Sequence, residues 1–180
     1  PIIIAMAIIV WLVAITNSIN FMDNMDGLCA GVSAISLLFF SLATWALGEQ
    51  TFMVLAMLAL MGAILGFLKY NFNPAKIFMG DCGSFFIGYM LACLIVFSTF
   101  YSSKSGQTAL ALAMPFVILA VPIFDTLTVI ALRIKRGLPV YQGDLNHFSH
   151  RLVSLGMTHK NAVLLIYLVS LVTGSSALLL

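Results

Sequence analysis

The side chains best suited to chemistry lie in three short polar segments of a chain that is otherwise strongly apolar. The first segment repeats an amide or a carboxylate every third residue, at Asn17, Asn20, Asp23 and Asp26. If this segment is helical, all four side chains share one face. Carboxylate and amide oxygens suit Mg²⁺, which often shares its ligands with substrate phosphates, and a cation would relieve the repulsion between the acids. The alternative is a solvated loop that turns at Asp26-Gly27.

A second polar segment, residues 71–84, combines glycine, acid, base and aromatic groups. Glycines flank Asp81, so the backbone permits close approach of a ligand. Lys76 supplies a positive charge for an anion, and Phe78 supplies an aromatic face on which a base can stack. We expect Ser84 to cap the following helix, whose N-terminus favours a phosphate. The alternative is a glycine-rich turn with a snorkelling lysine and an interfacial phenylalanine.

The third segment carries two histidines three residues apart, His147 and His150, followed by Arg151. Imidazole and guanidinium groups in this pattern can bind phosphate or transfer protons. A zinc site is not expected, because no cysteine neighbour completes a ligand set. The alternative is an amphipathic loop at the lipid headgroups.

Composition indicates which kind of scaffold has to position these segments. The chain has 180 residues, of which 62% are hydrophobic and 8% are charged, and its mean hydropathy is +1.13. Soluble domains are about 45–50% apolar and about 25% charged. The sequence therefore predicts an all-α polytopic integral membrane protein and excludes a soluble enzyme. A net charge of +2 is too small to indicate a nucleic-acid partner.

Six apolar segments approach the roughly 20 residues that a membrane-spanning helix needs. They are Ile2–Thr16, Leu28–Leu47, Phe52–Leu68, Phe85–Tyr101, Ala109–Leu132 and Ala162–Leu180. Pro115 and Pro122 are expected to bend or split the fifth segment. Because the sequence begins and ends inside apolar runs, we expect residues 1–180 to be a single membrane domain from a longer chain.

The basic residues predict how the spans are oriented. Seven of the eight lysines and arginines fall in three long polar segments, whereas Lys104 falls in a short one. By the positive-inside rule, this asymmetry puts the long segments in the cytoplasm. Five aspartates lie in or near the same segments, and Glu49 lies on the opposite side. We therefore expect one site, assembled at the cytoplasmic face from three segments.

Asp125 lies within the fifth span, where a charge is costly and indicates a functional site by default. A structural role is also open, in which Asp125 pairs with Arg133 or with a polar group of a neighbouring helix. An alternative function for the chain is secondary transport, with Asp125 as the ion-coupling site. Transporters usually keep their polar residues near the bilayer midplane between two repeats, however, and here the acids gather at one end.

Together, the polar segments resemble those of the polyprenyl-phosphate N-acetylhexosamine-1-phosphate transferases. The motifs that carry the resemblance are, in order, Asn17-x-x-Asn20-x-x-Asp23-x-x-Asp26-Gly27-Leu28, Pro74-Ala75-Lys76-Ile77-Phe78-Met79-Gly80-Asp81-x-Gly83-Ser84 and Asp144-x-x-His147-x-x-His150-Arg151-Leu152. Residues 122–126 also look like a family segment, and the resemblance covers about residues 10–155. The third motif is more similar to the GlcNAc branch than to the MurNAc-pentapeptide branch.

The resemblance implies phosphoryl transfer at the cytoplasmic face of a bacterial inner membrane. The phosphate of a polyprenyl (undecaprenyl) phosphate would attack the β-phosphate of a UDP-N-acetylhexosamine. The products would be polyprenyl-diphospho-sugar and UMP, at the start of cell-envelope polysaccharide synthesis. Mg²⁺ would be required, and Mn²⁺ could replace it. The expected partners are the UDP-sugar, the lipid and the bilayer; a homodimer is compatible with this assignment, and no nucleic acid is expected.

The resemblance also assigns roles to individual residues. Catalytic roles fall to Asp23, Asp26, Asp81 and His147, with Asp81 and Asp23 as the Mg²⁺ ligands. Substrate binding falls to Asn20, Asn71, Lys76, Phe78, His150 and Arg151. In this assignment Asn71 lies near the diphosphate and Phe78 stacks on uracil.

The chain departs from the family pattern in three respects. An Asp-Asp motif that family members carry earlier in the sequence would precede Pro1, so the fragment alone is expected to be inactive. Asn24-Met25 replaces the more usual Gly-Leu between the acids of the first motif, and Ser149 stands where many members have a histidine. A further alternative is an inactive scaffolding relative that binds other envelope enzymes.

Overall fold

The computed structural model describes residues 1–46, 48, 51–103, 108–137, 139 and 147–179. These described residues form eight helices and no strand. The helices are α1 (Ile2–Phe21), α2 (Leu28–Ala46), α3 (Thr51–Asn71), α4 (Gly80–Ser103), α5 (Thr108–Ile118), α6 (Ala120–Lys135), α7 (Phe148–Ser154) and α8 (His159–Ala177). Outside the described part of the chain lie Glu49, Lys104, Asp144 and the expected span ends Leu47 and Leu180.

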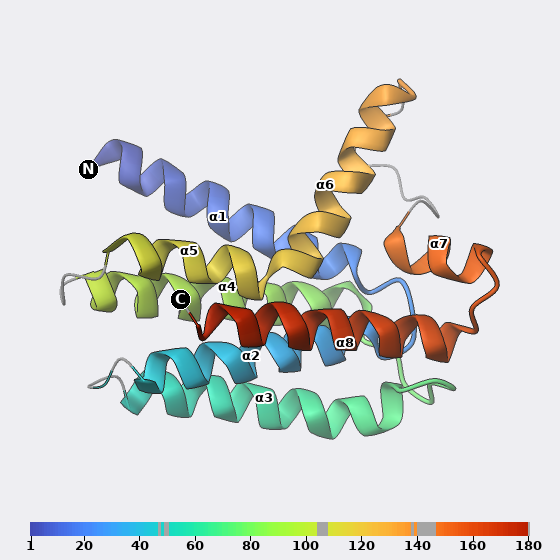
Figure 1. Cartoon of the computed structure of the whole chain (residues 1–180), viewed down its shortest axis with the longest axis horizontal. Helices are drawn as coiled ribbons and strands as arrows, with labels where there is room; N and C mark the ends of the chain where they lie inside the picture. Colours follow the sequence, from blue (N-terminus) through green and yellow to red (C-terminus); the bar gives the residue numbers. More distant parts are fainter. Residues whose placement is uncertain (47, 49–50, 104–107, 138, 140–146, 180) are drawn as a thin grey trace.

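Five helices, α1, α2, α3, α4 and α8, are long and apolar enough to cross a membrane. They run along one another in a layered bundle (Figure 1). The central helix is α2, most of whose residues are buried and which packs against α3, α8 and α4. By contrast, α1 exposes much of its apolar surface, including Ile2 and Ile3. The expected all-α polytopic membrane architecture is confirmed.

The fifth expected span is divided into α5 and α6 at Leu119, where φ is −93° and ψ is 18°. Pro122 has no N–H to donate to the carbonyl of Ile118, and its ring would clash with that carbonyl in a continuous helix. α6 therefore leaves the bundle at a steep angle to α5 (Figure 1). The split expected from the two prolines is confirmed, and the two pieces have only 11 and 16 residues.

Glycines allow α8 to pack closely against α2. A Cβ atom at Gly31 would lie 2.0 Å from the ring of Tyr167, and one at Gly174 would lie 2.1 Å from the ring of Phe39. Small residues at helix contacts are favoured in membranes, where close packing rather than exclusion of water drives helix association. These contacts fix α8 against the central helix and bring Tyr167 to the turn between α1 and α2.

The polar segments converge at one end of the bundle. α1 and α3 end there, α4 and α8 begin there, and α7 lies at the same end (Figure 1). Hydrogen bonds between side chains of different segments connect them at this end.

Three local expectations from the sequence are wrong. α1 extends to Phe21, beyond the expected end of the first span at Thr16, so Asn17 and Asn20 lie within this helix. The helical face that they share ends at Phe21, because the two acids of the first motif lie in the following turn. α4 begins at Gly80, so Ser84 lies inside the helix and does not cap it.

Candidate functional site

The first and second motifs meet where the end of α1 lies beside the start of α4. Asn20 Nδ2 donates to Asp81 Oδ1 at 3.1 Å and to Ser84 Oγ at 2.8 Å. Ser84 Oγ donates in turn to the carbonyl of Gly80 at 3.2 Å. Asn20 therefore orients Asp81 from a neighbouring helix. The hydroxyl of Ser84 helps to hold the Asn20 amide in place.

Asp23 and Asp81 form an acidic pair at this place. Burial raises the pKa of Asp23 and the charge of Asp81 raises it further, while a backbone hydrogen bond with Gly80 lowers it. Among the described residues, no three or more His, Cys, Asp or Glu side chains gather closely enough to hold a metal by themselves. Mg²⁺ needs only one or two protein carboxylates when substrate phosphate and water complete its coordination. The two carboxylates therefore fit Mg²⁺ bound together with a phosphate.

Asp26 holds the loop of the second motif. Its Oδ2 accepts hydrogen bonds from Asn73 Nδ2 at 3.1 Å and from the N–H of Ala75 at 3.0 Å. Hydrogen bonds to an ionised acceptor are roughly twice as strong as neutral ones. Asp26, which we expected to be catalytic, thus holds the loop of residues 72–79 in place. The sequence did not indicate this role.

Asn71, expected near the diphosphate, is buried with 4% of its surface exposed. Its Oδ1 accepts from the N–H of Gly27 at 3.0 Å, and its Nδ2 donates to the carbonyl of Ile77 at 2.9 Å. The hydroxyl of Tyr167 donates to the carbonyl of Gly27. Asn71 and Tyr167 therefore hold the turn after Asp26 from both sides. Nothing in the sequence pointed to Tyr167, which lies in the middle of an apolar span.

Lys76 and Phe78 lie on the surface of the loop that Asp26 and Asn71 hold. The backbone N–H of Lys76 donates to the carbonyl of Tyr70 at 2.8 Å, so the loop backbone is fixed here. The Lys76 side chain is exposed, and Phe78 is 78% exposed. A cation and an aromatic ring are thus presented to solvent next to the helix that carries Asp81.

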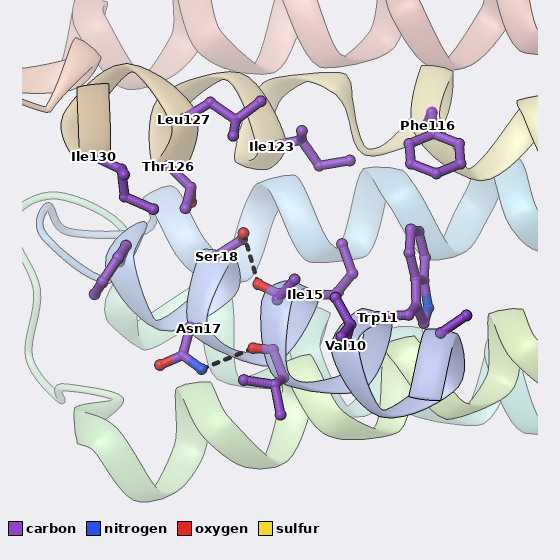
Figure 2. A pocket seen from close by; sticks show the side chains of 14 residues that line it. Val10, Trp11, Ile15, Asn17, Ser18, Phe116, Ile123, Thr126, Leu127 and Ile130 are labelled. Atoms are coloured by element: carbon purple, nitrogen blue, oxygen red, sulfur yellow. Dashed lines mark hydrogen bonds between the residues drawn. The ribbon is translucent and has the colours of Figure 1, made fainter. Parts of the chain in front are cut away.

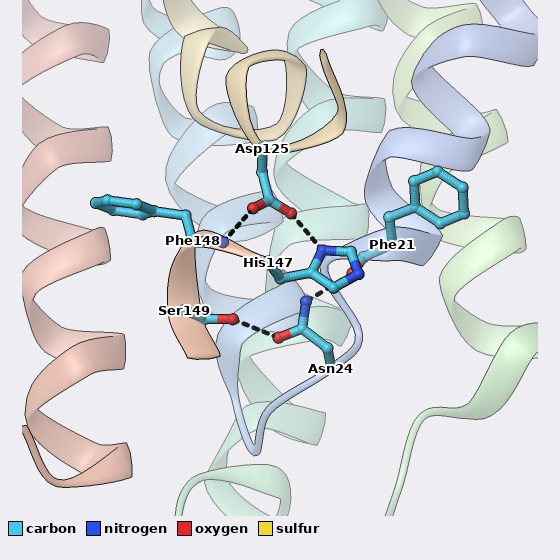
Figure 3. A network of polar contacts seen from close by, with 6 residues as sticks. All are labelled: Phe21, Asn24, Asp125, His147, Phe148 and Ser149. Carbon is cyan, nitrogen blue, oxygen red and sulfur yellow. Dashed lines mark hydrogen bonds and ion pairs between the residues drawn. The ribbon is translucent and has the colours of Figure 1, made fainter. Parts of the chain in front are cut away.

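The third motif is anchored by Asp125 of α6 (Figure 3). Asp125 Oδ2 lies 2.8 Å from His147 Nδ1, and Asp125 Oδ1 accepts from the N–H of Phe148 at 2.7 Å. Both Asp125 and His147 are buried, with 5% of their surfaces exposed. The sequence offered Arg133 or a neighbouring helix as the partner of Asp125. The structure places His147 there, from the segment that follows α6.

The other predicted residues of the third motif lie on α7. The rings of His147 and His150 have centroids 6.4 Å apart. Burial lowers the pKa of His150, and the charges of His147 and His159 lower it further, against an opposing effect of Asp125. These effects favour the neutral form of the His150 imidazole, whereas the side chain of Arg151 is exposed.

Two residues that depart from the family pattern contact each other. Ser149 Oγ donates to Asn24 Oδ1 at 2.7 Å, and Asn24 Nδ2 donates to the carbonyl of Phe21 at 2.7 Å (Figure 3). Ser149 is buried, with 2% of its surface exposed. The pair ties α7 to the turn after α1. The sequence marked each residue as a departure, but only the tertiary structure shows that they are partners.

An apolar groove of about 670 Å³ lies between α1 and the α5–α6 pair (Figure 2). Ile123, Thr126 and Ile130 of α6 point across it toward α1. The polar side chains of Asn17 and Ser18 donate to carbonyls of their own helix, at 2.7 and 2.8 Å, rather than into the groove. The groove therefore presents an almost wholly hydrocarbon surface.

Phe21 connects this groove with the third motif. It lines the groove, and its ring centroid lies 6.2 Å from that of His147. The guanidinium of Arg133 lies 5.6 Å from the centre of the same ring. One end of an apolar groove thus adjoins a histidine and an arginine, which are groups that bind phosphate.

Comparison with known proteins identifies the family of this chain. The family model of glycosyl transferase family 4 matches residues 1–99. The chain is 42% identical to the probable undecaprenyl-phosphate N-acetylglucosaminyl 1-phosphate transferase of Bacillus subtilis (strain 168), over 96% of this chain and 47% of that protein. It is 39% identical to the decaprenyl-phosphate N-acetylglucosaminephosphotransferase of Mycobacterium leprae, over 87% of this chain and 43% of that protein.

A third relative represents another branch. The chain is 34% identical to the phospho-N-acetylmuramoyl-pentapeptide-transferase of Carboxydothermus hydrogenoformans, over 89% of this chain and 46% of that protein. The chain thus spans about half the length of the curated relatives it matches. The match of the family model to more than half of the residues, together with these identities, shows that the chain belongs to glycosyl transferase family 4.

Proposed function

We propose that the protein transfers an N-acetylhexosamine-1-phosphate group, with GlcNAc-1-phosphate preferred, from a UDP-sugar to a polyprenyl phosphate and releases UMP. The convergence of three motif segments at one end of a membrane bundle carries this proposal. This convergence brings together three features at one end of the bundle. They are the Asp23–Asp81 pair, the exposed side chains of Lys76 and Phe78, and the His147 ring that Asp125 holds. The names of the relatives support a polyprenyl phosphate acceptor.

The reaction needs mainly positioning and neutralisation of charge. An oxygen of the lipid phosphate bonds to the β-phosphorus of the UDP-sugar, and the bond from that phosphorus to the bridging oxygen breaks, so that the bridging oxygen leaves with UMP. Phosphoryl transfer of this kind requires little covalent chemistry from the protein. The exposed ring of Phe78 is suited to stack on uracil, and Lys76 is suited to pair with a phosphate.

We assign the Mg²⁺ site to Asp81 and Asp23. Asn20 orients Asp81 at 3.1 Å, and the repulsion that raises the pKa of Asp23 would be relieved by a cation between the carboxylates. When bound, Mg²⁺ supplies positive charge to the diphosphate. Asp26 and Asn71 act in this proposal by holding the loop that carries Lys76 and Phe78.

The lipid acceptor is assigned to the apolar groove between α1 and α6. Its lining suits a polyprenyl chain, and the end near Phe21 would bring the lipid phosphate beside His147. The seven-to-one distribution of basic residues supports a cytoplasmic position for this end of the bundle. The higher identity to the two N-acetylglucosamine-phosphate transferases, 42% and 39% against 34%, supports GlcNAc as the sugar.

The test uses the complete reading frame that contains this chain, expressed in membranes or nanodiscs. Polyprenyl phosphate is offered with a panel of UDP-N-acetylhexosamines, and UMP release and lipid-linked sugar are followed together, with and without EDTA. We expect transfer that depends on Mg²⁺, is fastest with UDP-GlcNAc and is abolished in Asp81→Asn. Glu49→Gln is the matched control, because the sequence puts this acid in a short connection between two spans.

Two results would contradict the proposal. One is the absence of transfer from every UDP-sugar by folded protein that still binds them, which would favour a scaffolding relative. The other is full activity in Asp81→Asn together with loss in Asp125→Asn, which is the pattern expected of a carrier coupled through Asp125.

A further inference from the structure

We infer that Asp125 is a positioning residue, which fixes the orientation and the tautomer of His147 through Nδ1 and presents Nε2 to the reacting phosphates. This inference deepens the proposed function and rests on it for its catalytic consequence. The structural part concerns only where the proton of His147 resides, and can be tested without turnover.

Asp125 uses its two oxygens for two different tasks. Oδ1 accepts from the N–H of Phe148 at 2.7 Å, which satisfies the first backbone donor of α7. Oδ2 lies 2.8 Å from His147 Nδ1. The side chain of His147 makes no cap hydrogen bond at the start of this helix. Asp125 therefore caps α7 from another helix and holds the imidazole ring at the same time.

Burial makes this arrangement specific. Asp125 and His147 are each 5% exposed, so water does not compete for the carboxylate or for Nδ1. An ionised carboxylate is only an acceptor, so Nδ1 must carry the proton that it donates. The opposite edge of the ring, with Nε2, points away from Asp125 (Figure 3). Nε2 is thus left as the ring atom that can accept a proton, or donate one when the ring is charged.

Other groups around His147 define its electrostatic surroundings. His150 of α7 has its ring 6.4 Å away, and Phe21 of α1 has its ring 6.2 Å away on another side. Arg133 of α6 lies over that Phe21 ring at 5.6 Å. Among the residues that the structure describes, Asp125 is the acid in direct contact with the imidazole of His147. Because Asp125 contacts Nδ1 directly, replacing Asp125 should change which ring nitrogen of His147 carries the proton.

The exchange Asp125→Asn has a defined effect on the proton. The N–H of Phe148 still needs an acceptor, so the amide oxygen should take the place of Oδ1. The amide NH₂ then faces Nδ1 in place of Oδ2, and Nδ1 must accept. The proton of the neutral ring consequently moves to Nε2, which removes the acceptor from the side that faces the site.

The first experiment reads the tautomer directly in the full-length protein in nanodiscs. Histidine labelled with ¹⁵N gives separate ring-nitrogen signals, and those of His147 are assigned by their loss in His147→Gln. We expect a protonated Nδ1 in the wild type and a protonated Nε2 in Asp125→Asn, with His159 unchanged. A protonated Nε2 in the wild type, or the same tautomer in both proteins, would overturn the inference.

The second experiment measures transfer kinetics in single and double variants. Asp125→Asn should lower kcat about 10²–10⁴-fold, the usual contribution of general acid–base catalysis, with little change in KM for the UDP-sugar. Asp125→Glu should recover part of this loss. The double variant with His147→Gln should be no slower than His147→Gln alone, because Asp125 acts through that ring. Additive losses would overturn the inference.

Ser170→Ala is the matched control for a buried polar side chain. Its hydroxyl has no hydrogen-bond partner within the described part of the chain, and it lies on α8 rather than on α6 or α7. It should retain wild-type kinetics and the wild-type His147 signals. If the wild type transfers no sugar although His147 carries its proton on Nδ1, the proposed function fails and the structural assignment stands. If the wild type is active but the tautomer is reversed, the positioning role fails alone.

Discussion

Replacing Asp26 offers a quantitative test of how the site is held together. The structure gives its carboxylate two donors from residues 72–79, Asn73 Nδ2 at 3.1 Å and the N–H of Ala75 at 3.0 Å. Asp26→Ala removes both contacts, whereas Asp26→Asn can retain both as neutral hydrogen bonds to its amide oxygen. The loop of residues 72–79 should therefore open more readily in Asp26→Asn than in the wild type, and most readily in Asp26→Ala.

The magnitude follows from the two hydrogen bonds. A hydrogen bond to a charged group contributes about 1.5–3 kcal/mol, and the half-buried position of Asp26 favours the lower end, so Asp26→Ala should cost about 3 kcal/mol of loop-opening free energy. Since 1.4 kcal/mol is a factor of ten, the open fraction should rise roughly 150-fold. Asp26→Asn should lose about half as much free energy, which is roughly a tenfold rise.

Hydrogen exchange read by mass spectrometry measures this opening in the full-length protein in nanodiscs. Peptides that cover residues 72–79 should exchange faster in the order wild type, Asp26→Asn, Asp26→Ala, while α2 peptides stay unchanged. The matched control is Asp81→Asn, since Asp81 accepts from Asn20 and not from this loop. In transfer assays, KM for the UDP-sugar should rise more than kcat falls. Unchanged exchange together with a large loss of kcat would refute the reasoning and give Asp26 a direct catalytic role.

Three further predictions concern other parts of the site. The variants Asn24→Ala and Ser149→Ala should show a coupling energy of about 1 kcal/mol in a double-mutant cycle of thermal stability, because they remove one buried hydrogen bond; additive effects would contradict it. Ala14→Phe, which fills part of the apolar groove, should raise KM for polyprenyl phosphate and leave KM for the UDP-sugar unchanged. Burial and the charge of Asp81 raise the pKa of Asp23, so a proton competes with the metal as the pH falls below neutrality. Mn²⁺ binding, followed by paramagnetic resonance, should therefore weaken more steeply with falling pH in the wild type than in Asp23→Asn.

The architecture could be predicted from the sequence because bilayer chemistry constrains it strongly. Long apolar runs with few charges have few alternatives to helices, since backbone groups in hydrocarbon must be satisfied within the segment. The split of the fifth span was also predictable, because Pro122 removes a specific backbone hydrogen bond. Helix ends were predicted less well: α1 continues to Phe21, beyond its last strongly apolar run.

The site was predicted at the level of residue types and motifs rather than contacts. The sequence predicted that the acids of the first motif, Asp81 and the histidines form one polar region. This prediction followed from the order of the motifs and from the distribution of basic residues, which put all of them on one side of the membrane. The resemblance to a transferase family rests on the same motifs, and the family is confirmed.

Only the tertiary structure decided which polar groups are partners. Asp125 with His147, Asn24 with Ser149, and Asn71 with Gly27 are each far apart in the chain, and no spacing rule connects them. A hydrogen bond depends on distances and angles that are set by how helices pack, whereas the sequence specifies the character of each segment. The sequence therefore determined the membrane scaffold and the chemistry available at one of its faces, and the packing of the helices determined which side chains hold the others in place.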